Sequence, residues 1–200
     1  MIDTENKLKP KAFIFDIFGV ICGSLNTKWG KENLGNTPEL LARFNSLAKE
    51  IDSGIKHQSD YYDLASTMVH KSPEKIKNEI ESSFKINAEL MEVIGKLKEK
   101  YKTAICSNSD AIFVKHMFQE NGLLLENYFD FICISSEIGL LKPSEEIFRY
   151  CAQKINVIPS ECIFIDDVED NVEISKSVGM IGYQFTNTKL FKDWLKEKEL

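Results

Sequence analysis

The sequence predicts an α/β protein in which a Rossmann-like, doubly wound parallel sheet carries an inserted helical cap subdomain. Two observations lead to this fold class. Short apolar runs that end abruptly in polar residues alternate with helical patterns, and one long stretch after the first run contains helical patterns only. The chain has 200 residues, which is enough for one domain with its own core and a small insertion.

Several apolar runs of four to six residues have the character of buried strands, with Ile and Phe frequent among them. They cover residues 12–15, 103–106, 131–134, 162–165 and 180–185. Apolar residues without polar alternation are typical of strands that are covered on both faces, as in a parallel sheet. We therefore expect parallel strands whose ends at Asp16, Ser107 and Asp166 lie on one side of the sheet.

Helical patterns lie between these apolar runs. Leu90, Met91, Ile94 and Leu97 form one stripe at helical spacing within residues 88–100. Further helices are expected over residues 144–154, 168–178 and 189–200. Strands that alternate with helices imply right-handed crossovers, and hence a sheet with helices on both faces.

The stretch after the first strand interrupts this alternation. It contains no run typical of a buried strand, and helices are expected over residues 38–51, 59–70 and 73–84. A crossover usually needs only one helix, so this segment is predicted to form a separate subdomain. The predicted division is an α/β core of residues 1–21 and 86–200 and a helical cap of residues 22–85.

Composition excludes several classes of function. The net charge of −6 disfavours nucleic acid as the main partner, because an acidic chain gains nothing from a phosphate backbone. No apolar run reaches 18 residues and the first residues are polar, so neither a membrane span nor a signal segment is expected. The five cysteines lie among apolar neighbours without CxxC spacing, which favours a reduced, cytoplasmic location. The oligomeric state stays open.

Polar side chains follow the predicted strands where these strands end. Asp16, Ser107 and the pair Asp166 and Asp167 hold these positions, and ligands bind parallel sheets at this edge. Carboxylates brought together there would repel one another and need a cation. Oxygen ligands without His or Cys point to Mg²⁺. Each Asp alone could instead cap the helix that follows it.

Four motifs in order resemble those of the haloacid dehalogenase-like (HAD) hydrolase superfamily, and they cover nearly the whole chain. They are FIFDIFGVI at residues 13–21, ICSN at residues 105–108, GLLKP at residues 139–143 and FIDDVEDN at residues 164–171. The arrangement is similar to that of the helical-capped phosphatases of this superfamily. That subgroup includes sugar-phosphate phosphatases and the phosphatase domain of soluble epoxide hydrolase.

The resemblance implies a Mg²⁺-dependent phosphatase that acts on a small phosphate ester. Asp16 would attack phosphorus and form an aspartyl-phosphate, which water then hydrolyses. Ser107 and the Asn108 amide would hold phosphoryl oxygens, and Lys142 would place a positive charge beside Asp16. The expected metal ligands are Asp16, the backbone carbonyl of Phe18 and Asp167, with Asp166 binding directly or through a water.

Phe18 departs from the family pattern. Most phosphatases of this family carry a second Asp two residues after the nucleophile, which protonates the leaving alcohol and then activates water. Phenylalanine can do neither, although its carbonyl can still bind a metal. Losing such an acid typically costs about 10²- to 10⁴-fold in rate. Asp110 lies near Ser107 and could be recruited instead, but its expected role is that of a carboxylate in the first turn of a helix.

Two alternatives to the phosphatase remain open. A non-catalytic or weakly active binding protein could have kept the fold after losing the acid. A 2-haloacid dehalogenase is a third possibility, because those enzymes also place an aromatic residue two after the Asp and use a Ser-Asn second motif. Such a reaction needs no metal, so Asp166 and Asp167 would have no role. The regions expected to select the substrate are residues 23–29 and the turn at residues 52–54.

Overall fold

The computed structural model describes residues 9–34 and 37–200, and these form a five-stranded sheet in which every pair of neighbouring strands is parallel. The strand order is β3-β2-β1-β4-β5. The strands are β1 (Ala12–Phe15), β2 (Lys102–Ser107), β3 (Phe131–Ile134), β4 (Cys162–Asp166) and β5 (Ile181–Gln184). The predicted α/β class with a doubly wound parallel sheet is thereby confirmed.

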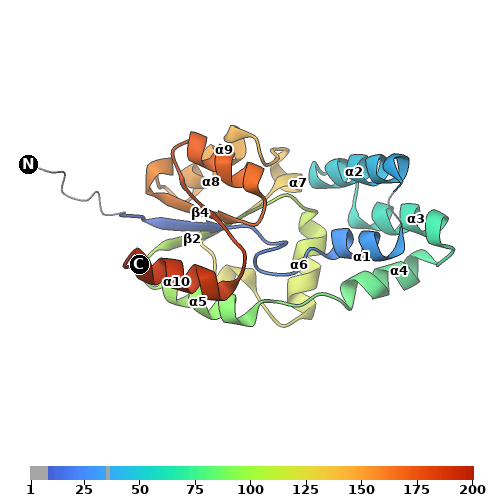
Figure 1. The fold of residues 1–200 in the computed structure, drawn as a ribbon, viewed down its shortest axis with the longest axis horizontal. Helices are drawn as coiled ribbons and strands as arrows, with labels where there is room; N and C mark the ends of the chain where they lie inside the picture. Colours follow the sequence, from blue (N-terminus) through green and yellow to red (C-terminus); the bar gives the residue numbers. More distant parts are fainter. Residues whose placement is uncertain (1–8, 35–36) are drawn as a thin grey trace, which may run out of the picture.

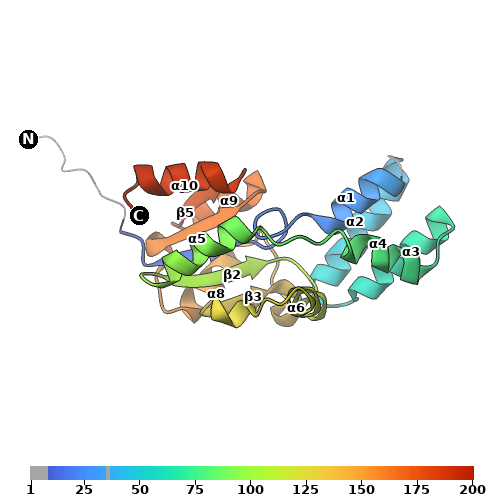
Figure 2. The same cartoon turned by 90° about the horizontal axis from the view of Figure 1, so that it is seen from below.

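Helices cover both faces of this sheet, as the predicted crossovers require (Figures 1 and 2). One layer contains α8 (Glu145–Lys154) and α9 (Glu169–Ser177), and the other contains α5 (Ala88–Lys98), α6 (Ala111–Glu120) and α10 (Thr188–Glu197). The side chains of successive β1 residues pack on opposite faces of the sheet. Ala12 and Ile14 pack in the core under α8, whereas Phe13 and Phe15 pack in the core on the opposite face.

The helices expected from the sequence agree with the observed ones to within a few residues. No range was predicted from the sequence for α6, or for the short helices α7 (Ser135–Ile138), η1 (Leu125–Asn127) and η2 (Pro159–Glu161). The last three have four residues or fewer, which is too short for a helical period to emerge. All five cysteines are free and buried, as their apolar neighbours suggested.

Four helices occupy the insertion between β1 and α5 and lie together at one end of the molecule (Figure 1). They are α1 (Leu25–Asn33), α2 (Pro38–Asp52), α3 (Gln58–Val69) and α4 (Pro73–Glu81). The sequence pattern predicted the last three of these helices but not α1. That helix buries only Leu25 and Trp29, which is too weak a stripe to predict it from periodicity.

Two adjacent linkers join this helical insertion (residues 25–81) to the sheet. The N–H of Asn87 donates to the carbonyl of Ile21 at 2.8 Å, and Cys22 forms an antiparallel bridge with Ile86. The chain therefore leaves and re-enters the α/β part at one place. Phe13 and Phe15 belong to an apolar cluster that also contains the buried apolar side chains of the insertion. The core on that face of the sheet is therefore continuous with the core of the insertion. Among the described residues, no helix has the length and apolar character needed to cross a membrane.

Candidate active site

The loop after β1 places Asp16 at the carboxyl edge of the sheet. The N–H of Asp16 still donates to the carbonyl of Ile165 in β4, at 2.9 Å. The chain then turns sharply, because the carbonyl of Ile17 accepts from the N–H groups of both Ile21 (2.8 Å) and Cys22 (2.9 Å). Asp16 thus belongs to a rigid, hydrogen-bonded structure and is only 6% exposed.

Gly19 allows this loop to lie against the end of β4. Its φ of +97° is in the left-handed region, and a Cβ built there would overlap the carboxylate of Asp167. Any other residue would therefore strain the backbone and push Asp167 away. Gly19 of the first motif therefore leaves the space that the carboxylate of Asp167, in the fourth motif, occupies.

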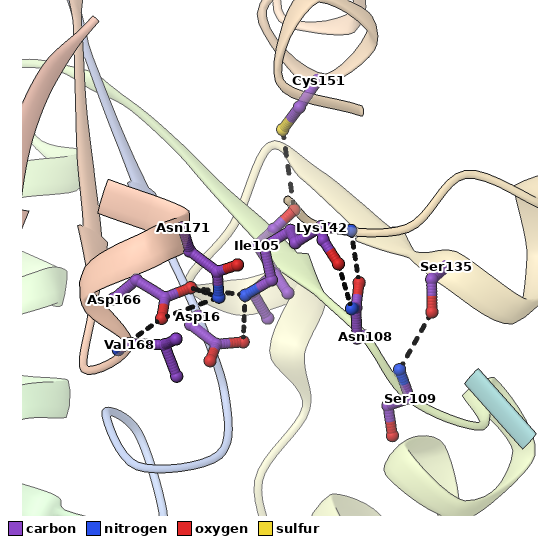
Figure 3. Close-up of polar contacts among 10 residues, drawn as sticks. All are labelled: Asp16, Ile105, Asn108, Ser109, Ser135, Lys142, Cys151, Asp166, Val168 and Asn171. Carbon is purple, nitrogen blue, oxygen red and sulfur yellow. Dashed lines mark hydrogen bonds and ion pairs between the residues drawn. The ribbon is translucent and has the colours of Figure 1, made fainter. Parts of the chain in front are cut away.

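Three carboxylates converge at this edge. Asp16, Asp166 and Asp167 each offer an oxygen within 4.8 Å of the others. Lys142 lies beside two of them, with its Nζ 2.9 Å from Asp16 Oδ1 and 2.6 Å from Asp166 Oδ2 (Figure 3). The contact with Asp16 is an ion pair whose angle does not meet that of a hydrogen bond, so Asp16 Oδ1 remains without a hydrogen-bond partner.

Asp166 and Asp167 differ sharply in how they are held. Asp166 is fully buried, and both of its oxygens accept hydrogen bonds from the side chain of Asn171 at 3.1 Å (Figure 3). It also accepts from the N–H of Val168 at 2.9 Å and from Lys142. In contrast, Asp167 Oδ1 is buried without a hydrogen-bond partner. Asp166 is therefore already satisfied by the protein, whereas Asp167 is not.

Burial and crowding leave this cluster with unbalanced negative charge. Burial raises the pKa of Asp16 from 3.8 to about 6, although Lys142 lowers it, and the charge of Asp166 raises it. Burial and Asp166 likewise raise the pKa of Asp167. Burial alone would lower the pKa of Lys142, but Asp16 and Asp166 raise it above its ordinary value. The lysine is therefore a fixed positive charge rather than a proton donor.

The end of β2 adds Ser107 and Asn108. Ser107 Oγ is buried and has no hydrogen-bond partner. Both polar atoms of the Asn108 side chain are engaged by Lys142: its Nδ2 donates to the carbonyl of Lys142, and its Oδ1 accepts from the N–H of Lys142, both at 2.8 Å. The Asn108 side chain therefore holds the lysine segment in place (Figure 3).

These groups open onto a pocket of about 350 Å³ between the sheet edge and the helical insertion. Phe18 lines it and stacks on Phe113 of α6, with ring centroids 6.4 Å apart. Polar residues line the wall: Ser24, just before the insertion, and Asn26, Thr27, Asp52 and Gln58 from the insertion itself. Asn26 and Gln58 form a reciprocal amide pair, with hydrogen bonds of 3.1 and 2.8 Å.

Asp110 also lines the pocket, but its carboxylate is occupied. Oδ1 caps α6 by accepting from the N–H groups of Ile112 (2.9 Å) and Phe113 (3.4 Å). Oδ2 accepts from the N–H of Gln58 at the start of α3, at 2.9 Å, and lies 3.4 Å from His57 Nδ1. Asp110 is thus the N-cap residue of α6 and joins α3 to the core.

The structure therefore brings together the predicted residues Asp16, Ser107, Lys142, Asp166 and Asp167. The sequence motifs indicated no role for Asn171, which orients Asp166, or for Asn26, Asp52 and Gln58. Asn26 lies within residues 23–29 and Asp52 within the turn at residues 52–54, both named as regions that select the substrate. For Asn171, its place in the fourth motif was the available signal; for Gln58, no signal existed.

Comparison with known proteins agrees with this geometry. Among curated proteins, a D-ribitol-5-phosphate phosphatase from Bacteroides thetaiotaomicron is 31% identical over 105 residues, which cover 50% of each chain. A fructose-1-phosphate phosphatase from Escherichia coli is 23% identical over 91 residues, which cover 46% of this chain and 47% of that protein. The chain thus matches about half the length of these relatives.

Solved structures share the fold over nearly the whole chain. A HAD family enzyme from B. thetaiotaomicron, in complex with magnesium and inorganic phosphate, has a TM-score of 0.72 at 23% identity and covers 91% of this chain and 99% of its own. A HAD-like hydrolase from Porphyromonas gingivalis has a TM-score of 0.75 at 22% identity, with coverages of 94% and 97%. A family model of haloacid dehalogenase-like hydrolases matches residues 10–179. Because that match includes every residue of the carboxylate cluster, the chain belongs to the HAD-like hydrolases.

Proposed function

We propose that this protein is a Mg²⁺-dependent phosphomonoester hydrolase that works through an aspartyl-phosphate on Asp16. One observation carries the proposal. Three buried side-chain oxygens of the described residues have no hydrogen-bond partner, namely Asp16 Oδ1, Ser107 Oγ and Asp167 Oδ1, and all three lie in this site. Buried polar atoms without hydrogen bonds are costly, and Asp16 Oδ1 has only its ion pair with Lys142. The concentration of three such atoms in one place supports a site built for a polar ligand.

The donor set fits Mg²⁺. Asp16, Asp167 and the carbonyl of Phe18 offer hard oxygen ligands. Asp166 is held by Asn171 and Lys142, and it supports these ligands from the side away from the proposed metal. Among the described residues that line the pocket, four are carboxylates and Lys142 is the one cation. A divalent cation would relieve this imbalance and would neutralise the phosphate dianion that Asp16 must approach.

The remaining roles follow from what the side chains can reach. The Asp16 carboxylate attacks phosphorus, forming an acyl phosphate, and Lys142 stabilises the charge that builds on the phosphoryl oxygens. Ser107 donates its hydroxyl hydrogen to one of these oxygens. The Asn108 side chain is committed to Lys142, so its backbone N–H is the group that we assign to the phosphoryl oxygens. Water then hydrolyses the acyl phosphate and regenerates Asp16.

The substrate is proposed to be a small, polar phosphate ester. A pocket of about 350 Å³ suits a metabolite rather than a macromolecule. The Asn26 and Gln58 amides face it from the helical insertion and could bind hydroxyl groups of the leaving alcohol. Two relatives act, by their names, on ribitol and fructose phosphates. In this proposal residues 22–85 act as a cap that closes the site and selects the leaving group.

Two other functions remain as outcomes of the test. Phe18 favours a non-catalytic binding protein, because it removes the usual acid. A dehalogenase is less consistent with the site, because an anionic Asp167 beside an unassisted nucleophile would only raise the barrier to attack.

A screen of phosphate esters, with Mg²⁺ or with a chelator, tests the proposal. We expect release of inorganic phosphate that requires Mg²⁺, is lost in Asp16→Asn and is retained in Asp63→Asn, a control at an exposed carboxylate of α3. Mg²⁺ binding without turnover would indicate a binding protein. Halide release from 2-haloacids without Mg²⁺ would indicate a dehalogenase.

A further inference from the structure

The pocket contains one carboxylate that neither the metal site nor the fold uses. Four carboxylates line the pocket: Asp16, Asp52, Asp110 and Asp167. Asp16 and Asp167 belong to the proposed nucleophile and metal cluster. Asp110 is occupied by the N–H groups that start α6 and α3. Asp52 is left, and among the described residues no hydrogen bond or ion pair engages its carboxylate.

The backbone of Asp52 is firmly held. Asp52 is the last residue of α2, and its carbonyl accepts a hydrogen bond of 2.6 Å from the hydroxyl of Ser135. Two residues later, Gly54 lies so close to α7 that an added Cβ would be 2.5 Å from the carbonyl oxygen of Ser136. A turn docked in this way holds the Asp52 side chain at the pocket wall. The free carboxylate is therefore presented to the pocket on a fixed backbone.

The surroundings of Asp52 suit proton transfer. Burial raises its pKa from 3.8 to about 6, while Lys142 lowers it and Asp16 raises it. The influence of Lys142 and Asp16 places Asp52 within electrostatic reach of the reacting groups. A general acid works best when its pKa is near the working pH, and an ordinary surface Asp does not meet that condition.

We propose that Asp52, carried by the helical insertion, is the acid and base residue that takes the place of the carboxyl group absent at Phe18. The proposal rests on the phosphatase function proposed above. It also implies that the site is complete only when the insertion is docked on α7. The catalytic set of the family would then be retained in this chain, with one member moved from the core to the insertion.

The proposed steps balance as follows. As the bond between Asp16 and phosphorus forms, the ester P–O bond breaks, and its electron pair stays on the leaving oxygen. That oxygen takes the proton of Asp52 and departs as an alcohol. The Asp52 carboxylate then takes a proton from water as the water oxygen bonds to phosphorus. The bond between phosphorus and Asp16 breaks, its electrons return to the Asp16 carboxylate, and inorganic phosphate leaves.

The dependence of rate on the leaving group distinguishes this role from a structural one. A series of aryl and alkyl phosphates of graded leaving-group pKa should be measured with wild type, Asp52→Asn and Glu39→Gln. Glu39 is an exposed carboxylate at the other end of α2 and is the matched control. We expect Asp52→Asn to lose about 10²-fold or more in kcat on alkyl esters and little on 4-nitrophenyl phosphate. Glu39→Gln should match wild type throughout.

The outcomes separate this proposal from the phosphatase function itself. If wild type turns over esters and Asp52→Asn leaves that turnover unchanged, or lowers it equally for all esters, Asp52 is not the acid. The proposed phosphatase function would still stand. No turnover of any ester by wild type with Mg²⁺ bound would overturn both. Thermal melting and circular dichroism of each variant establish that it is folded, and Asp52→Ala provides a second variant that also lacks the acid.

Discussion

The hydroxyl of Ser135 donates a hydrogen bond of 2.6 Å to the backbone carbonyl of Asp52, which lies 83 residues earlier in the chain. The same oxygen accepts from the N–H of Ser109 at 3.0 Å. Ser109 follows Ser107 and Asn108 after β2, so one buried hydroxyl joins the end of α2 to the loop that we propose to bind phosphate. The helical insertion and the candidate active site are coupled through this atom.

Ser135→Ala should weaken that coupling. The variant removes both hydrogen bonds of this hydroxyl and leaves the buried N–H of Ser109 unpaired, which costs about 1–3 kcal/mol of stability. If the Asp52 turn loosens, turnover of alkyl phosphates should fall, by roughly fivefold for each 1 kcal/mol of lost positioning. Turnover of aryl phosphates should change less. Thermal melting and the leaving-group series measure the two effects, and an equal loss on both ester classes would contradict the proposed coupling.

Gly54→Ala tests the docking of the same turn from its other side. Gly54 has a φ of +77°, and a Cβ there would press on the carbonyl of Ser136. Gly122→Ala is the matched control, because Gly122 has a φ of +73° but no described heavy atom within 4 Å of its added Cβ. Both variants should lose about 1–2 kcal/mol from backbone strain. Only Gly54→Ala should also lose activity on alkyl esters. A similar loss of activity in Gly122→Ala would mean that reduced stability alone explains the effect.

Asp167→Asn should weaken Mg²⁺ binding and leave the fold intact. The substitution removes the charge of a carboxylate whose buried Oδ1 has no hydrogen-bond partner and which, unlike Asp16, forms no ion pair with Lys142. Asp170→Asn, at an exposed position in the first turn of α9, serves as the control. Calorimetric titration with Mg²⁺ measures both. Unchanged affinity in Asp167→Asn would mean that Asp167 is not a ligand.

Asp16→Asn should stabilise the metal-free protein at neutral pH while abolishing turnover. The pKa of Asp16 is about 6 in the folded state, against 3.8 for an ordinary Asp. The unfolded state therefore loses the proton first, and wild type loses stability as pH rises from about 4 through 6. The variant avoids this loss, by an amount on the order of 1 kcal/mol, or about 2–4 °C in Tm. Melting curves in a chelator at pH 4 and pH 8 should show the gap only at the higher pH, and a constant gap would contradict the argument.

Phe18→Asp should affect turnover differently in two backgrounds. In wild type it should bring little gain on alkyl phosphates, because Asp52 already acts as the acid. In Asp52→Asn it should recover turnover of these esters, because it restores the family residue. Loss of the stacking between Phe18 and Phe113 should cost about 0.5–1.5 kcal/mol beyond the lost apolar burial. A large gain in wild type, measured as kcat on alkyl esters, would show that no acid was present before the change.

The sequence by itself determined the sheet and the position of the carboxylate cluster. In β1, β2 and β4 an apolar run leads directly to a polar residue, which ends the strand or follows it. Because parallel strands bring their carboxyl ends to one edge, Asp16, Ser107 and Asp166 were expected at that edge, and the strand order β2-β1-β4 makes them neighbours. The helix α1 escaped prediction, because two buried side chains do not create a period.

Only the tertiary structure decided which carboxylates are free. Asp110 and Asp52 look alike in the sequence, each near a helix end, but Asp110 accepts a hydrogen bond from Gln58, 52 residues away, whereas Asp52 meets Ser135 only through its backbone carbonyl. Asp166 and Asp167 are likewise adjacent, and the packing of Lys142 and Asn171 satisfies one and leaves the other open. The contacts of Gln58, Ser135 and Lys142 with these residues span 24 residues or more of the chain. They are set by the packing of the helical insertion and the sheet, and no local pattern encodes them.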